Sequence, residues 1–109
     1  MKKYEAFKTV RDTLKSKGVM LQPNTATSVG IFSVYDIETE VWNPPFTSDD
    51  LSALRVFTTA CIDNPNLAII LFRVANFDTT DGYCEGITYE IVNSETIDNI
   101  IKANGGIDE

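Results

Sequence analysis

The stretch from Ile31 to Gly82 constrains the fold more than any other part of the chain. It places a strand, a proline-aromatic turn, a helix and a second strand one after another, with few residues left for loops. β-Branched and aromatic residues fill Val29 to Tyr35, which is typical of a strand. Asn43-Pro44-Pro45 must then end any strand, because proline cannot donate a ladder hydrogen bond.

A helix is predicted from Asp49 to Ile62. Thr47 or Ser48 can cap its first amides, and the aspartates that follow complement the positive end of the helix dipole. Asp63-Asn64-Pro65-Asn66 ends it. Its apolar face, which we expect to lie on a sheet, gathers Leu51, Leu54, Phe57 or Thr58, Cys61, Ala53 and Ala60.

The residues before this helix predict a hairpin. From Ile37 to Trp42 the sequence alternates Ile37, Thr39 and Val41 with Glu38, Glu40 and Trp42. We interpret this alternation as a half-solvated strand. A tight turn around Asp36 would pair it with Val29 to Tyr35. The carboxylates Asp36, Glu38 and Glu40 could bind a divalent ion, but exposure to solvent on one strand face is the simpler interpretation, so no metal site is predicted.

The residues after the helix predict a second hairpin. Leu67 to Ala75 is nearly continuous apolar sequence that only Arg73 interrupts, as in a central strand covered on both faces. Asp78 to Gly82 is a hairpin loop whose glycine suits a positive φ. Tyr83 to Val92 alternates as an antiparallel strand with one buried face.

A helix at each end completes the predicted domain. Lys2 to Lys17 carries an apolar stripe at helical spacing, and Gly18 occupies the position of a left-handed cap. Ser94 is expected to cap a last helix, Glu95 to Ala103. The stripe of the first helix consists of Tyr4, Phe7, Val10 and Leu14.

These elements predict a single α+β domain in the order α-ββ-α-ββ-α, with a mostly antiparallel sheet of about four strands. Its parts are a basic helix plus linker at 1–28, a core module at 29–92, and a helix and tail at 93–109. Val19 to Leu21 could be a short strand or an anchoring apolar patch. Gln22 to Ser28 is rich in turn-forming residues and is the candidate linker.

Charge is segregated along the chain. The first 18 residues hold six basic and two acidic side chains, whereas the remainder holds three basic and 14 acidic ones. Because an acidic surface repels phosphates, any nucleic-acid contact is expected from the basic helix alone. The alternative is that these cations solvate the outer face of an amphipathic helix. The candidate contacts are Lys2, Lys3, Lys8, Arg11 and Lys15.

Catalytic chemistry has little support in this sequence. The chain contains no histidine and no glycine-rich phosphate loop, so a non-enzymatic protein without a cofactor is predicted. Cys61 and Cys84 are expected to be reduced, buried and structural. No apolar run approaches the roughly 20 residues that cross a bilayer, and no signal segment follows the first lysines, so we expect no membrane and a cytosolic location.

Aromatic residues supply a second candidate surface. Trp42 and Phe46 flank Pro44-Pro45, where they could dock a partner or wedge the hairpin against the helix. Together with Tyr35 they form a candidate aromatic edge. Arg55 is a candidate partner or phosphate contact, unless it pairs with Asp49 or Asp50 near the start of its own helix or with the neighbourhood of Thr59.

Several short motifs resemble the small non-structural protein of gokushovirus-type microviruses. They are Phe32-Ser33-Val34-Tyr35-Asp36, Pro45-Phe46, Ala53-Leu54-Arg55-x-Phe57 with Asp63, Leu71-Phe72-x-Val74-x-x-Phe77-Asp78, and Asp81-Gly82. The resemblance implies a phage protein of the host cytoplasm that switches replication from double-stranded to single-stranded genomes. Tyr35, Arg55, Phe57 and Asp78 are the positions that transfer, and the resemblance assigns them no defined role.

Three functions follow as hypotheses. The first is the phage replication switch, which binds single-stranded DNA or the viral or host replication machinery through the basic helix and the aromatic edge. The second is an acidic host-takeover or anti-defence inhibitor that binds a host nucleic-acid-binding protein. An enzyme or metal protein is the weakest of the three. A structural virion protein and a homodimer stay open.

Overall fold

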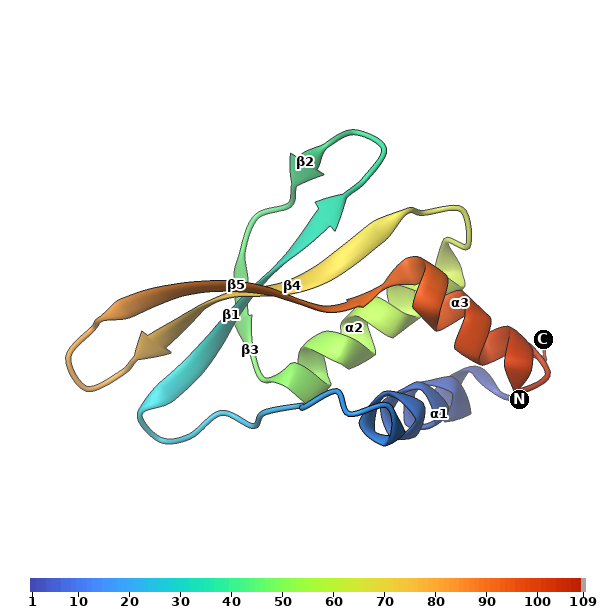
Figure 1. Ribbon diagram of the computed structural model, residues 1–109, viewed down its shortest axis with the longest axis horizontal. Helices are drawn as coiled ribbons and strands as arrows, with labels where there is room; N and C mark the ends of the chain where they lie inside the picture. The colour runs from blue at the N-terminus through green and yellow to red at the C-terminus, as the bar shows by residue number, and fades with distance from the viewer. Residues whose placement is uncertain (109) are drawn as a thin grey trace.

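The computed structural model describes residues 1–108 (Figure 1). The prediction of an α+β domain with an antiparallel sheet is confirmed: three helices accompany a five-stranded sheet. In chain order the elements are α1 (Lys3–Ser16), β1 (Ser28–Asp36), β2 (Val41–Trp42), β3 (Phe46–Ser48), α2 (Asp50–Asp63), β4 (Ile69–Asp78), β5 (Cys84–Asn93) and α3 (Ser94–Ala103).

The sheet is built around the long antiparallel pair of β1 and β4. β4 also pairs with β5, which forms one edge. The other edge of β1 is shared: β2 pairs with its last residues, where Tyr35 is opposite Trp42, and β3 pairs near Phe32, which is opposite Phe46. Both predicted hairpins therefore exist, although the first is much shorter than expected.

The predicted strand from Ile37 to Trp42 is wrong over most of its length. Residues 37–40 form a turn instead, and only Val41 and Trp42 pair with β1. The Asp36 carboxylate accepts hydrogen bonds from the backbone N–H groups of Glu38 (3.0 Å) and Thr39 (3.2 Å). Such local side-chain hydrogen bonds compete with strand pairing, which explains why the alternating pattern misled the prediction.

The two predicted helix caps are each displaced by one or two residues. Asp49 caps α2 by accepting from Ser52 N at 2.7 Å, because Thr47 and Ser48 belong to the unpredicted strand β3. Asn93 caps α3, and its carboxamide oxygen accepts from the third helical residue. Ser94 instead accepts a hydrogen bond from Ile69 N at 3.1 Å, which ties the start of α3 to the start of β4.

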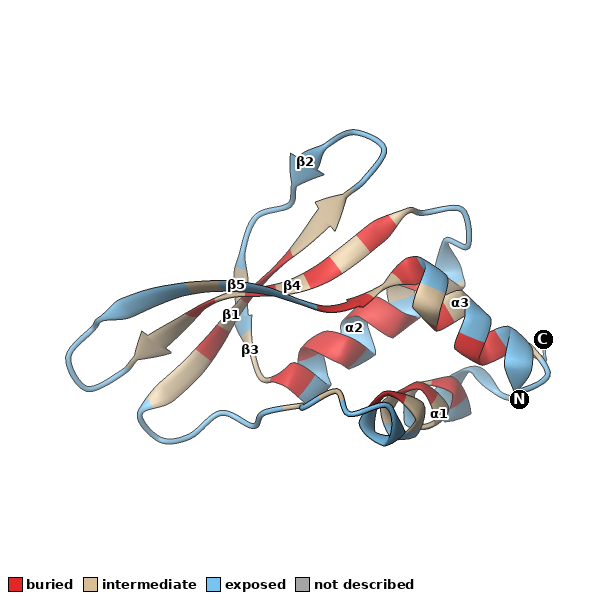
Figure 2. Ribbon diagram, viewed as in Figure 1, coloured by how far each residue is buried: buried red, intermediate tan, exposed pale blue. Residues whose placement is uncertain are grey.

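The core lies between the helices and one face of the sheet. The three helices pack against one another, and Figure 2 shows buried residues on all three of them. Phe57 is 2% exposed and belongs to the same buried cluster as Phe32 and Leu71 of the sheet, which confirms the prediction that α2 covers the sheet. Two stripe residues were placed wrongly: Tyr4 is 80% exposed and Leu51 is 37% exposed. Both lie at the edge of the apolar face of their helix, where the 3.6-residue helical period points their side chains toward solvent.

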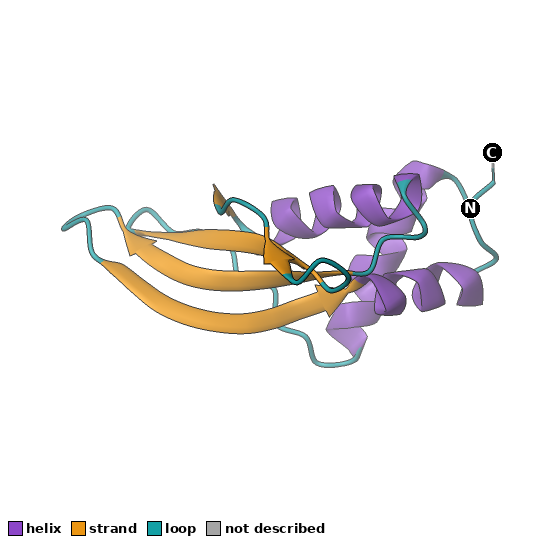
Figure 3. Ribbon diagram, turned by 90° about the horizontal axis from the view of Figure 1, so that it is seen from above, coloured by secondary structure: helices purple, strands orange, loops and turns teal. Residues whose placement is uncertain are grey.

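The sheet extends beyond the helices. Figure 3 shows a curved layer of strands whose β4–β5 hairpin projects away from all three helices. Two predictions fail for this reason. β4 alternates between buried and half-buried residues, so it is covered on one face only. β5 is buried only at Ile91 and Val92, near α3, rather than along a whole face.

The segment between α1 and β1 contains no strand. Val19 and Leu21 pack against the core, which leaves the apolar patch as the correct alternative. The predicted linker is tied to its surroundings: Gln22 O accepts from Asp50 N at 3.4 Å, and Asn24 Oδ1 accepts from Gly30 N at 3.0 Å. This segment does not separate two structural units.

Candidate functional site

An aromatic cluster lies on the sheet face that the helices leave open. The rings of Tyr35 and Trp42 are 4.9 Å apart, and those of Trp42 and Phe72 are 5.0 Å apart, measured between centroids. Strand pairing explains this arrangement, because residues directly opposite each other on neighbouring strands point to the same face of the sheet. Tyr35 lies opposite Trp42, and Ser33 lies opposite Phe72. Trp42 is 47% exposed despite these contacts.

Apolar residues extend this cluster along the same face. Their positions follow from the pairing of β1 with β4 and from the alternation of side chains along β1. None of them belongs to the described hydrophobic core. They are Val29, Ile31, Ile70 and Phe77. We call this surface, with Tyr35, Trp42 and Phe72, the open face.

The predicted aromatic edge divides between the two sides of the sheet. Tyr35 and Trp42 are together, as expected, but Phe46 stacks on Phe32 at 5.9 Å and packs against the core. Phe72 takes its place in the cluster. Sequence reasoning missed Phe72 because it lies in a continuous apolar run, where no alternation distinguishes a buried residue from a half-exposed one.

The segments that build the open face carry mostly negative charge. Residues 28–48 and 69–93 contain one cation, Arg73, which is buried at 3% exposure. Glu90 lies directly opposite Phe72, and Glu38 and Glu40 are in the turn next to Trp42. The complete set of carboxylates in these segments is Asp36, Glu38, Glu40, Asp78, Asp81, Glu85 and Glu90. A partner for this face needs cations rather than phosphates.

The predicted basic contacts lie elsewhere. Lys8 and Lys15 are exposed on α1, and Lys2 is exposed at its N-cap; α1 packs against α2 and α3 (Figure 1). Lys3 forms an ion pair with Asp63, and Arg11 forms one with Asp12 at 3.0 Å. The structure therefore does not join these cations and the aromatic cluster into one binding surface.

Arg55 does not pair with either aspartate at the start of α2, so that predicted alternative is wrong. Its guanidinium carbon lies 4.8 Å from the centre of the Phe7 ring on α1. Arg11 approaches the same ring at 5.9 Å. The Arg55 contact joins α2 to α1 through cation–π attraction, whereas the Arg11 contact lies within α1.

A buried ion pair that the sequence analysis did not find connects α2 to the sheet. Arg73 Nη1 donates to Asp50 Oδ1 at 2.6 Å, and the two side chains are 3% and 0% exposed. Asp50 Oδ2 also accepts from Gln22 N at 2.6 Å, and Arg73 Nε donates to Asn76 Oδ1 at 2.8 Å. Burial and the Asp50 charge raise the pKa of neighbouring Tyr89. Because each charge is paired and hydrogen-bonded, this group is structural.

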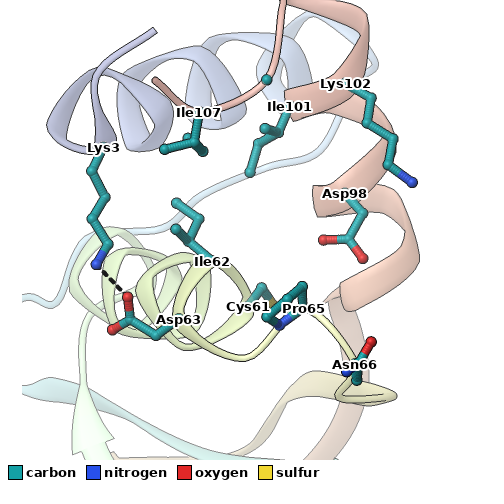
Figure 4. A pocket seen from close by; sticks show the side chains of 11 residues that line it. Lys3, Cys61, Ile62, Asp63, Pro65, Asn66, Asp98, Ile101, Lys102 and Ile107 are labelled. Carbon is teal, nitrogen blue, oxygen red and sulfur yellow. Dashed lines mark ion pairs between the residues drawn. The ribbon is translucent and has the colours of Figure 1, made fainter. Parts of the chain in front are cut away.

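A cavity of about 670 Å³ opens between the ends of α2 and α3, the start of α1 and residues 106–107 (Figure 4). Its wall carries Lys3 and Lys102 together with Asp63 and Asp98, so its charges balance. Burial and the Asp98 charge raise the pKa of the Cys61 thiol to about 12, which keeps this wall residue protonated and unreactive. Burial likewise raises the pKa of Asp98.

The two cysteines are free, as predicted, but only Cys61 is buried. Cys84 is exposed because it lies in the projecting hairpin, opposite Phe77. Within residues 1–108, no three side chains of the metal-binding types come together in a way that could hold an ion. In the same range, no helix is long and apolar enough to cross a membrane.

Comparisons with protein-family models, with curated proteins and with solved structures found no match for this chain.

Proposed function

We propose that this chain is a non-enzymatic binding module whose open face docks on a basic surface of another protein. The observation that carries this proposal is the Tyr35, Trp42 and Phe72 cluster, which no helix covers and which has Glu90 and the acidic turn at residues 37–40 beside it. A host nucleic-acid-binding protein is the partner class that fits, because its nucleic-acid site presents cations to an acidic occupant. The activity is that of an inhibitor acting in the host cytoplasm.

The chemistry of the open face favours protein over nucleic acid. Tryptophan and tyrosine are frequent energetic centres of protein interfaces, where a few central residues supply most of the affinity. Bases could also stack on these rings, but their phosphates would then lie beside Glu90 and the turn at residues 37–40. Single-stranded DNA needs cations next to the stacking platform, and residues 28–48 and 69–93 expose none.

A second candidate function is the phage replication switch, with single-stranded DNA held on α1. It is supported by the short motifs that resemble the microvirus protein and by the exposed Lys2, Lys8 and Lys15. At most three or four cations can face one strand, so the logarithm of the affinity would fall with the logarithm of salt at a slope of about −2 to −3.

A capture experiment separates the two candidates. The tagged chain is incubated with bacterial lysate, with and without nuclease, and bound proteins are identified. Trp42→Ala removes the centre of the aromatic cluster, and Tyr4→Ala is the matched control because Tyr4 is an aromatic residue that is 80% exposed on α1. A third variant reverses the charges of Lys8, Arg11 and Lys15. Direct titration with a single-stranded oligonucleotide at low salt completes the comparison.

The protein-binding proposal expects a nuclease-resistant partner that Trp42→Ala loses and that the other two variants retain. The identified partner should carry a basic surface, and its affinity for the purified chain should fall at least tenfold with Trp42→Ala. Capture that disappears with nuclease and with the charge reversal would instead establish DNA binding through α1. A partner that Trp42→Ala does not affect would refute the assignment to the open face.

A further inference from the structure

An apolar pocket lies on the helix side of the sheet, between α2 and the strands β1 and β4. It encloses about 240 Å³. Ala53, Phe57 and Ala60 of α2 form one wall, and Val34 and Leu71 contribute to the opposite one. Apolar cavities of about 150 Å³ are known to hold a benzene molecule, so this pocket has room for one large aliphatic or aromatic side chain.

Exposed apolar side chains mark the mouth of this pocket. Val56 on α2 is 64% exposed, and Leu67, in the loop before β4, is 40% exposed. One of these residues is on the helix and the other precedes the first residue of β4. An occupant that entered between them would cover apolar surface on both sides, which favours binding by removing that surface from water.

Negative charge lies directly beside the mouth. Asp36 lines the pocket, and a second, shallower hollow of about 480 Å³ adjoins it through Leu67, which borders both. Glu38 and Asp63 line that hollow, and no cation does. Asp63 is paired with Lys3, and Asp36 Oδ1 already accepts from two backbone N–H groups of the turn, so Glu38, in the exposed turn after β1, is the carboxylate that we expect to face a partner's cation.

We infer that this pocket receives a large apolar side chain from a short segment of a partner protein, with a lysine or arginine of the same segment facing Glu38. The inference goes beyond the proposed function, because the pocket opens on the helix side and the aromatic cluster lies on the opposite face of the sheet. The two sites adjoin the same turn, residues 37–40, and are otherwise built from different residues.

A selection from a phage-displayed library of random peptides tests this inference on the whole chain. The expected enrichment is one large apolar residue with a lysine or arginine within a few positions of it. An enriched peptide is then synthesised with a fluorophore, and its affinity is measured by fluorescence anisotropy. Ala60→Leu fills the pocket with a residue that favours helix formation. Thr59→Leu is the matched control, because Thr59 is exposed on α2 and does not line the pocket.

Two further variants make the outcome decisive. Val56→Asp places a charge at the mouth of the pocket. Because Val56 is 64% exposed, this variant should fold normally, and circular dichroism checks its fold. Glu38→Lys reverses the charge beside the mouth. We expect Ala60→Leu and Val56→Asp each to weaken the peptide at least tenfold, Glu38→Lys to weaken it several-fold, and Thr59→Leu and Trp42→Ala to leave it unchanged.

The inference is overturned if no sequence is enriched, if enriched peptides lack the apolar residue, or if their binding withstands Ala60→Leu and Val56→Asp. Peptides that Trp42→Ala weakens and Ala60→Leu does not would place the contact on the open face, in agreement with the proposed function and against the pocket. If the wild-type chain captures no partner through the open face but still binds the enriched peptide in the pocket, the proposed function alone is refuted.

Discussion

Replacing Asp50 with alanine should destabilise this protein more than any exposed charge substitution. The carboxylate is fully buried and accepts hydrogen bonds from Arg73 Nη1 and Gln22 N, each at 2.6 Å. Its removal leaves the Arg73 guanidinium, which is 3% exposed, beside Phe32 and without an anionic partner, although Asn76 still accepts from Arg73 Nε. The backbone N–H of Gln22 loses its acceptor as well.

The expected loss is about 3–5 kcal/mol, the usual effect of breaking a buried ion pair from one side. The free energy of unfolding of a natural protein is about 5–15 kcal/mol, so we expect the variant to fold but with a much smaller free energy of unfolding. Replacing Arg73 with methionine in the same chain removes the stranded charge. The double variant should therefore be more stable than the sum of the two single effects by about 1–3 kcal/mol.

Urea unfolding followed by circular dichroism measures each free energy. Asp12→Ala is the control, because it breaks the Arg11–Asp12 pair, in which the aspartate side chain is 56% exposed. This change should cost no more than about 1 kcal/mol. A loss below about 1 kcal/mol for Asp50→Ala, or strict additivity in the double variant, would show that the buried pair does not hold α2 on the sheet.

Three further predictions concern single positions. Gly30→Ala should cost about 1–3 kcal/mol by overpacking, because its Cβ would lie 2.8 Å from Phe32 Cε2, whereas Gly86→Ala meets open space and should stay within about 0.5 kcal/mol in the same unfolding assay. A thiol reagent should modify Cys84 in the native protein and Cys61 only after unfolding; equal native rates would contradict the burial of Cys61. Burial raises the pKa of Asp98, so its contribution to stability is present below the unfolded pKa of about 4 and is lost as pH rises through the folded pKa. Asp98→Asn should therefore raise the melting temperature at neutral pH, and this gain should vanish in acid; a gain that persists there would refute it.

Local sequence signals predicted most of the helices and strands. The apolar stripe of α1 and the glycine after it placed that helix within one residue at each end, because helix periodicity and capping depend on neighbours in sequence. The hairpin loop before β5 was found for the same reason, since Gly82 has a φ of 75°. The turn at residues 37–40 was missed because the hydrogen bonds of Asp36 outweighed an alternating pattern.

The candidate sites depend on contacts between residues that are distant in sequence. Sequence alone indicated that Tyr35 and Trp42 belong together, but the pairing of β1 with β3 and β4 decided that Phe46 enters the core and that Phe72 joins the open face. The Asp50–Arg73 pair joins residues 23 positions apart, and no local pattern records such a partner. The amino-acid sequence thus determined the elements and the segregation of charge, whereas tertiary packing decided which face of each strand is covered, because side-chain exposure depends on what other elements pack against it.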